Sequence, residues 1–128
     1  MNLFHSSKKS PVQILVERCK KITELNLRAT FINKISVDYI SENLSELEKL
    51  DISENELEDQ DFLPLRQLPK LRTLVVEDEK YGVTKEKVQN LGKMIPQLKK
   101  IIQLPQYSFR SMGIANAYKT YDLLDGFW

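Results

Sequence analysis

Few side chains in this 128-residue chain have the types and spacing that catalysis or metal binding requires. His5 is the single histidine, and the single cysteine, Cys19, has no local partner that resembles a general base. The acidic stretch DISENELEDQD, residues 51–61, offers carboxylates of the kind that bind calcium, but it lacks the glycine of an EF-hand loop. No residues have zinc-ligand spacing, and the four glycines form no phosphate-binding loop. We therefore expect no enzyme activity, no metal and no cofactor.

An internal repeat indicates the elements that would position a binding surface instead. The stretch LEKLDISENEL, residues 47–57, fits the pattern L-x-x-L-x-L-x-x-N-x-L. ITELNLRATFI precedes it, LRTLVVEDEKY follows it, and a degenerate fourth unit begins LKKI; the four units start at residues 22, 47, 71 and 98. The starts are thus 25, 24 and 27 residues apart, within the range of about 20–29 for leucine-rich repeats. We predict an α/β leucine-rich-repeat solenoid of about four repeats, with a curved parallel sheet on the concave side and helices on the convex side.

Apolar spacing predicts the individual elements. Alternating apolar positions give short strands buried on one face, at Leu25/Leu27, Leu50/Ile52 and Leu74/Val76. Ser10 followed by Pro11 predicts the start of a helix that faces the core with Ile14 and Leu15. Helical intervals recur in two further sets, Val37, Ile40, Leu44 and Leu47, then Val88, Leu91, Ile95 and Leu98. Residues 58–70, with Pro64 among them, predict one tight helical turn.

After Pro105 the repeat stops. Ile114, Tyr118, Tyr121 and Leu124 are spaced as one helical face with Gly126 placed to end it, so we predict a C-terminal capping helix. The resulting organisation is a flexible N-terminal segment (1–10), a leucine-rich-repeat domain (11–105) and a C-terminal cap or tail (106–128). A tail that folds along the concave face or docks a partner is the alternative.

The strand register predicts which side chains face a partner. Residues that alternate with the buried strand positions would point outward on the concave face: Glu24, Asn26, Arg28, Lys49, Asp51, Ser53, Thr73, Val75, Glu77, Lys100 and Ile102. The aromatic tail adds Tyr107, Phe109, Tyr118, Tyr121 and Trp128. Two registers are open for the fourth strand. One exposes Ile102 and Leu104 beside Val75 and buries Gln103, and a one-residue shift buries Ile102 and Leu104 instead.

The run CKKITELNLRATFI, residues 19–32, resembles repeats of F-box leucine-rich-repeat proteins through Cys19, Leu25, Leu27 and the T-x-I of residues 30–32. This resemblance implies a substrate-recognition or adaptor role in a ubiquitin-ligase complex. No F-box precedes the repeats, so we expect either a fragment of a larger receptor or a chain that works with another subunit. LDISENELED followed by DFLPLRQLPKL resembles the phosphatase-regulator or splicing-factor type, which makes a regulatory or assembly subunit of such a complex the alternative.

Composition and charge restrict the class of partner. The net charge of +1 does not favour nucleic acid, although Lys85, Lys87, Lys93, Lys99 and Lys100, with Tyr107 or Phe109 for stacking, leave RNA binding as a third interpretation. No apolar run is long enough for a membrane span, and the N-terminus lacks the apolar segment of a secretory signal. We expect an intracellular protein, cytoplasmic or nuclear, that binds another protein through its concave face. Self-association through an uncapped end of the solenoid is also open.

Overall fold

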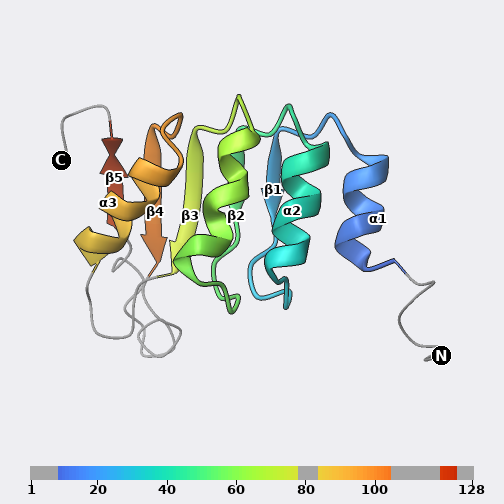
Figure 1. Cartoon of the computed structure of the whole chain (residues 1–128), viewed down its shortest axis with the longest axis horizontal. Helices are drawn as coiled ribbons and strands as arrows, with labels where there is room; N and C mark the ends of the chain where they lie inside the picture. Colours follow the sequence, from blue (N-terminus) through green and yellow to red (C-terminus); the bar gives the residue numbers. More distant parts are fainter. Residues whose placement is uncertain (1–8, 78–83, 105–118, 124–128) are drawn as a thin grey trace.

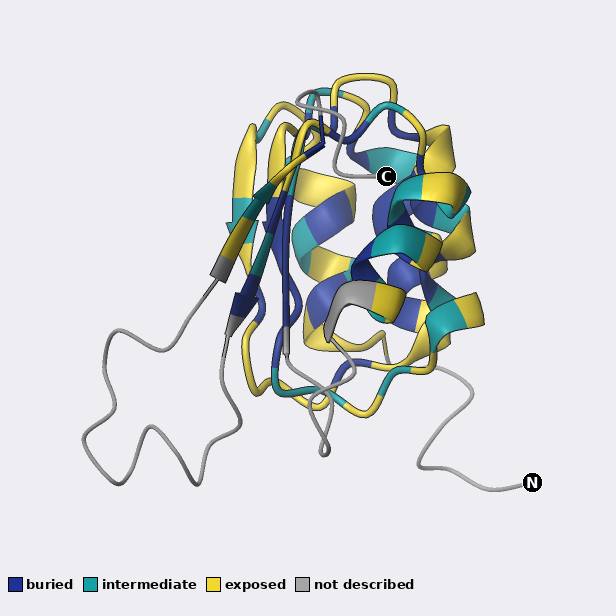
Figure 2. Ribbon diagram, turned by 90° about the vertical axis from the view of Figure 1, so that its left-hand side faces the viewer, coloured by how far each residue is buried: buried dark blue, intermediate teal, exposed yellow. Residues whose placement is uncertain are grey.

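Four parallel strands and one antiparallel strand form the sheet of this protein, whose computed structural model describes residues 9–77, 84–104 and 119–123. The strands lie in chain order: β1 (Glu24–Asn26), β2 (Lys49–Asp51), β3 (Thr73–Glu77), β4 (Lys100–Leu104) and β5 (Lys119–Asp122). The helices are α1 (Pro11–Arg18), α2 (Lys34–Asn43), the 3-10 helix η1 (Asp59–Gln67) and α3 (Thr84–Met94). All of them lie along one face of the sheet (Figure 1), and the side view shows two layers with the buried residues between them (Figure 2).

Equivalent positions of the predicted units pair across the parallel strands. Leu25 pairs with Leu50, Leu50 with Leu74, and Leu74 with Ile101. These side chains point toward the helices, where the last three are fully buried. The predicted alternation of the strands is therefore confirmed for β2 and β3, whereas Leu25 in the edge strand β1 is only half-buried.

The helices complete the core with the two apolar sets that the spacing predicts. In α2 and the turn after it, the members of the first set are completely buried, and those of the second set, in and after α3, are at most 4% exposed. Between β2 and β3 the tight helical turn extends to the nine residues of η1, with Pro64 inside it. Gln97 donates to the carbonyl oxygens of Leu65 and Leu68, at 3.1 and 2.8 Å, and so fixes the end of η1 to the turn after α3.

One asparagine side chain joins the first two units. Asn55 Oδ1 accepts hydrogen bonds from the backbone N–H groups of Thr30 and Ile32, both at 3.1 Å. Its Nδ2 donates to three carbonyl oxygens, those of Leu27 (2.9 Å), Ile52 (3.1 Å) and Ser53 (3.1 Å). The loop it holds contains Ala29 and Phe31 in the left-handed region, with φ of 53° and 60°, which costs a non-glycine residue about 1–3 kcal/mol. The Asn55 bonds offset that cost.

The first helix begins as predicted but faces the core differently. Ser10 caps α1 and accepts a hydrogen bond from the N–H of Gln13 at 3.1 Å. Val12 and Val16 are the buried residues, whereas Ile14 is 39% exposed, so the expectation for Ile14 was wrong. The helix packs against α2 on one side only, and an i, i+4 pair is enough to fill that contact. On its exposed side, Lys9 donates to Glu17 at 2.7 Å, and this hydrogen bond lowers the pKa of the Glu17 carboxyl.

At the C-terminal end the structure has a strand where the capping helix was predicted. The part of that helix within the described residues, Lys119–Asp122, forms β5 antiparallel to β4. Tyr121 pairs with Ile101 and packs against the core, and Leu123 is 8% exposed. Tyr121 and Leu123 therefore face the core at the two-residue spacing of a strand, not as one face of a helix. The strand is favoured because it also forms hydrogen bonds with the backbone groups along the edge of β4.

The fourth strand has the register that turns Ile102 away from the helices. Ile101 pairs with Leu74 and Ile102 with Val75, so the one-residue shift does not occur. In consequence, Gln103 lies on the helix side of the sheet at 2% exposure. Its Oε1 and Nε2 have no hydrogen-bond partner among the residues that the structure describes. Such a buried, unpaired amide costs roughly 1–3 kcal/mol.

Replacing the buried amide should therefore stabilise the fold. We expect Gln103→Leu to raise the free energy of unfolding by about 1–2 kcal/mol, measured by urea denaturation. Gln97→Leu is the matched control and should lower it by about 1–2 kcal/mol, because it removes two hydrogen bonds to backbone carbonyls. A destabilising Gln103→Leu would show that the amide is satisfied in solution.

Candidate functional site

The face of the sheet opposite the helices, hereafter the open face, collects outward side chains in two rows. Alternate residues of a strand point to opposite faces, and the shared register aligns them across the sheet. The first row is Glu24, Lys49, Thr73, Lys100 and Asp122. The second row is Asn26, Asp51, Val75, Ile102 and Thr120. Most of the residues predicted for the concave face therefore lie side by side on the open face.

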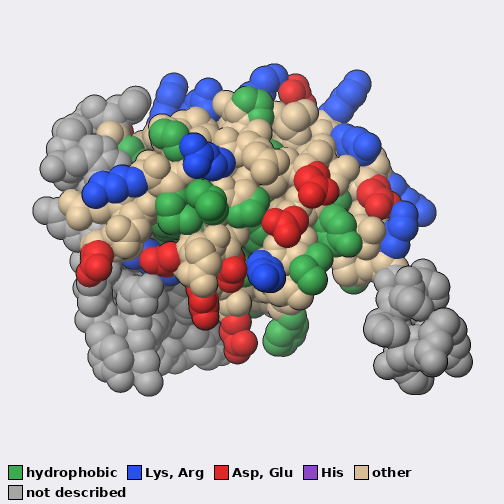
Figure 3. All heavy atoms as spheres, in the orientation of Figure 1, with side chains coloured by type: hydrophobic (Ala, Val, Ile, Leu, Met, Phe, Trp, Pro, Cys, Tyr) green, Lys and Arg blue, Asp and Glu red, His purple; other side chains and the backbone are tan. Residues whose placement is uncertain are grey.

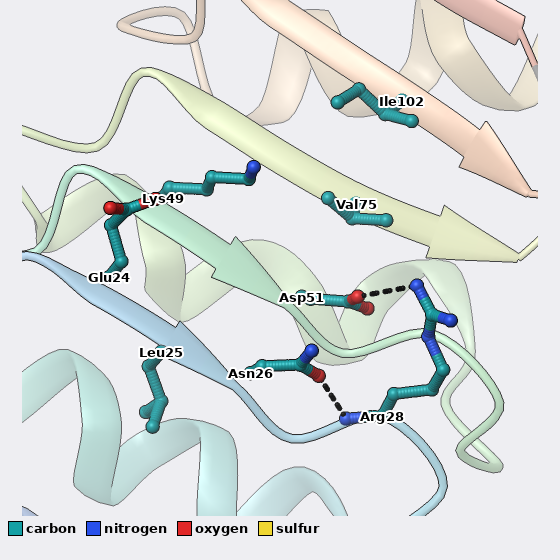
Figure 4. A pocket seen from close by; sticks show the side chains of 8 residues that line it. All are labelled: Glu24, Leu25, Asn26, Arg28, Lys49, Asp51, Val75 and Ile102. Atoms are coloured by element: carbon teal, nitrogen blue, oxygen red, sulfur yellow. Dashed lines mark hydrogen bonds and ion pairs between the residues drawn. The ribbon is translucent and has the colours of Figure 1, made fainter.

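A hollow of about 510 Å³ occupies the β1 side of the open face. Its lining comes from β1, β2, β3, β4 and the loop after β1: Glu24, Leu25, Asn26, Arg28, Lys49, Asp51, Val75 and Ile102 (Figure 4). Leu25 is the member that sequence reasoning assigned to the core. It lines the hollow because β1 is an edge strand with a neighbour on one side only, a position that the pattern of the first unit cannot reveal.

In the polar part of the hollow, the charges of Arg28 and Asp51 neutralise each other. Arg28 pairs with Asp51 Oδ2 at 3.0 Å, and its Nε donates to Ser53 Oγ at 3.1 Å. Asp51 Oδ1 in turn accepts from the N–H and the hydroxyl of Ser53, at 3.0 and 2.7 Å. The Asp51 side chain is 9% exposed and the Arg28 side chain 40%. The carboxylate therefore holds Arg28 in place, and the guanidinium is the group that a partner can contact.

The apolar part of the hollow lies next to that ion pair. Val75 is 4% exposed and Ile102 is half-buried, and the two are register partners in neighbouring strands. Lys49 extends over the sheet toward them rather than toward Glu24 (Figure 4). An apolar centre that is surrounded by charged residues is the composition of a typical protein-binding surface.

Several other predicted site residues do not contribute to the open face. Tyr121 lies on the helix side of the sheet, packed against the core. The side chain of Glu77 falls outside the described part of the structure. So do four predicted tail residues, Tyr107, Phe109, Tyr118 and Trp128, and also His5.

Several carboxylates between residues 46 and 61, and one lysine of the RNA interpretation, Lys87, form local pairs. Glu46 binds Lys70 at 3.0 Å, and Asp61 accepts from the N–H of Glu58 at the start of η1. Lys87 lies 3.8 Å from Asp59 and 5.8 Å from the ring centroid of Phe62. On the helix side, Lys and Arg side chains are interspersed with carboxylates (Figure 3). The lysines of the RNA interpretation are also spread over different elements: Lys85, Lys87 and Lys93 belong to α3, Lys99 precedes β4, and Lys100 lies on the open face.

A second hollow, of about 240 Å³, lies between α1 and the loop before α2. Phe31 borders it at 98% exposure, held in its left-handed conformation between the two N–H groups that Asn55 binds. The sequence pattern leaves this position unspecified, so its exposure was not predicted.

The described residues contain no assembled set of metal ligands. Cys19 is half-buried at the end of α1, and no group of three or more potential metal ligands occurs in the part of the chain that the structure describes. In the same residues, no helix has the length and apolarity to cross a membrane.

These features define a fold of the leucine-rich-repeat type. No protein-family model matches the chain, and no curated protein matches it. Among solved structures, the chain is similar to the tropomodulin C-terminal domain of Caenorhabditis elegans, with a TM-score of 0.51 and 20% sequence identity. The match covers 74% of this chain and 63% of that one. The tropomodulin domain has a leucine-rich-repeat fold, and at this identity the likeness concerns the fold alone.

The Arg28–Asp51 pair should contribute measurably to stability. We expect Arg28→Ala to lower the free energy of unfolding by about 1–3 kcal/mol, because it leaves a largely buried carboxylate without its ion pair. A double-mutant cycle with Asp51→Asn should give a coupling of at least about 0.5 kcal/mol. Lys70→Ala is the control: its pair with Glu46 is exposed, and its loss should cost under about 0.5 kcal/mol. Equal effects of the two alanine substitutions would contradict this assignment.

Proposed function

We propose that this chain is a non-catalytic protein-binding module made of four leucine-rich repeats, and that its open face, which would be the concave side, contacts the partner. The main support for the proposal is the orientation of two neighbouring side chains in β4. Ile102 points to the open face while Gln103 is buried without hydrogen bonds. A sequence selected for stability alone would exchange these two side chains, so the apolar residue on the open face suggests selection for binding.

The surroundings of Ile102 support the same function. Val75 packs at its side, Arg28 is fixed by Asp51 at the rim, and Lys49 extends over the hollow. Because strands hold Val75 and Ile102 and the pair with Asp51 holds Arg28, these three side chains would lose little entropy on binding. A preformed surface of this kind favours a folded or extended protein partner.

For the class of partner we propose a ubiquitin-ligase substrate or ligase subunit, with the protein acting inside the cell. This part rests on the resemblance of residues 19–32 to F-box leucine-rich-repeat proteins. Thr30 supports it, because its hydroxyl donates to the Leu27 carbonyl at 2.7 Å and so gives the T-x-I motif a structural role. A phosphatase or RNA-processing partner is the competing outcome, although the carboxylates and lysines that it would use are partly engaged in local pairs.

Affinity capture with the full chain tests the proposal. We expect Ile102→Ser to reduce the amount of captured partner at least about tenfold, since loss of a central apolar contact costs more than about 1.4 kcal/mol. Leu63→Ser, at a 42% exposed position of η1 on the helix side, is the matched control and should leave capture unchanged. Quantitative mass spectrometry of the retained proteins measures both.

Three results would change the conclusion. Equal capture by wild type and Ile102→Ser would contradict binding through the open face. Recovery of a phosphatase or of RNA-processing factors would replace the ubiquitin-ligase assignment. Capture that disappears after nuclease treatment would favour RNA binding, and steep salt dependence for a generic oligonucleotide would support that outcome.

A further inference from the structure

We propose that the open face recognises an extended protein segment with an acidic side chain two residues from an aliphatic one. The carboxylate would lie over Thr73 between Lys49 and Lys100, and the aliphatic side chain would lie on Ile102, beside the nearly buried Val75. This inference rests on the proposed function and names the chemistry of the partner.

The first row places two lysines on either side of one hydroxyl. Lys49 and Lys100 are both register partners of Thr73. Neighbouring strands are about 4.8 Å apart, so the two lysine Cα atoms are separated by roughly 10 Å. Both flexible side chains can approach one carboxylate above Thr73, whose hydroxyl is available as a third donor.

The positive charge of this row is at its centre. Lys49 and Lys100 are exposed, and among the described residues neither forms an ion pair within 4 Å. Glu24 and Asp122 lie at the two ends of the row, and Lys49 extends away from Glu24 (Figure 4). Arg28 differs, because Asp51 already neutralises it. An acidic group of a partner is therefore best accommodated in the middle of the row.

The second row supplies the apolar contact at a matching distance. Val75 and Ile102 follow Thr73 and Lys100 by two residues, which corresponds to about 6.6 Å along a strand. Side chains i and i+2 of an extended peptide are separated by the same distance and point to the same side. One peptide strand can thus place an acidic and an aliphatic side chain on the two rows together.

The charge of the first row favours a carboxylate over a phosphate. Glu24 and Asp122 balance Lys49 and Lys100, so the row as a whole has no net positive charge. A phosphate group carries a charge of about −1.5 to −2 at pH 7 and would be repelled more strongly by the two carboxylates than a partner carboxylate with a single charge.

A displayed library of random ten-residue peptides, selected with the full chain, tests the inference. We expect enrichment of Asp or Glu two positions from Leu, Ile or Val. For one selected peptide, fluorescence anisotropy should show binding at least about tenfold weaker with Lys49→Glu/Lys100→Glu, and intermediate binding with Lys49→Gln/Lys100→Gln. Lys93→Glu, an exposed position on α3, is the matched control and should bind like wild type. Circular dichroism of each variant verifies the fold.

The outcomes separate this inference from the proposed function. Selected peptides that need Ile102 but show no acidic preference would overturn the inference and leave open-face binding intact. Preference for phosphoserine over Glu in a matched synthetic pair would overturn the carboxylate assignment. Binding that is insensitive to the lysine variants and to Ile102→Ser would contradict both. A library without any enriched peptide would also overturn the inference, while the capture experiment still tests the proposed function.

Discussion

The amide of Asn55 is the interaction on which the arrangement of the first units depends. It binds backbone groups of its own turn and of the preceding loop, so it fixes where the chain leaves β2 and where it leaves β1. With both exits fixed, backbone bonds continue past the strands, from Leu27 to Asp51 and from Ala29 to Ser53. The same amide also holds the loop that presents Phe31. An alternative pairing of these strands would leave buried donors and acceptors without partners, which is costly in a protein interior.

The shared register has a functional consequence on the other side of the sheet. Core leucines in register require that the residues between them are in register as well, because strand side chains alternate between the two faces. The charged first row and the partly apolar second row of the open face follow directly from the packing of Leu50, Leu74 and Ile101. Stability thus sets the positions of the outward side chains, while their chemical identity is free to be selected for a partner.

Sequence reasoning predicted the parallel units, the two main helices and most of the open face, because each depends on a repeated apolar spacing. It could not predict features that depend on the ends of the array. Ile14 is exposed because α1 has one neighbouring helix, and Leu25 lines a hollow because β1 has one neighbouring strand. Tyr121 fits a helix and a strand equally well by pattern, and the edge of β4 decides between them. The Arg28–Asp51 pair joins residues 23 positions apart, a contact that no local pattern encodes.

Both rows of the open face depend on the orientation of β4. Nuclear Overhauser effects measured on methyl-labelled protein can establish this orientation. We expect cross-peaks between the methyl groups of Val75 and Ile102, which share the open face, and contacts from the Gln103 amide to residues of the core. Cross-peaks from Ile102 to Leu91 or Ile95 in the core, together with a rapidly exchanging Gln103 amide, would contradict it. They would establish the shifted register and remove the apolar centre of the binding surface.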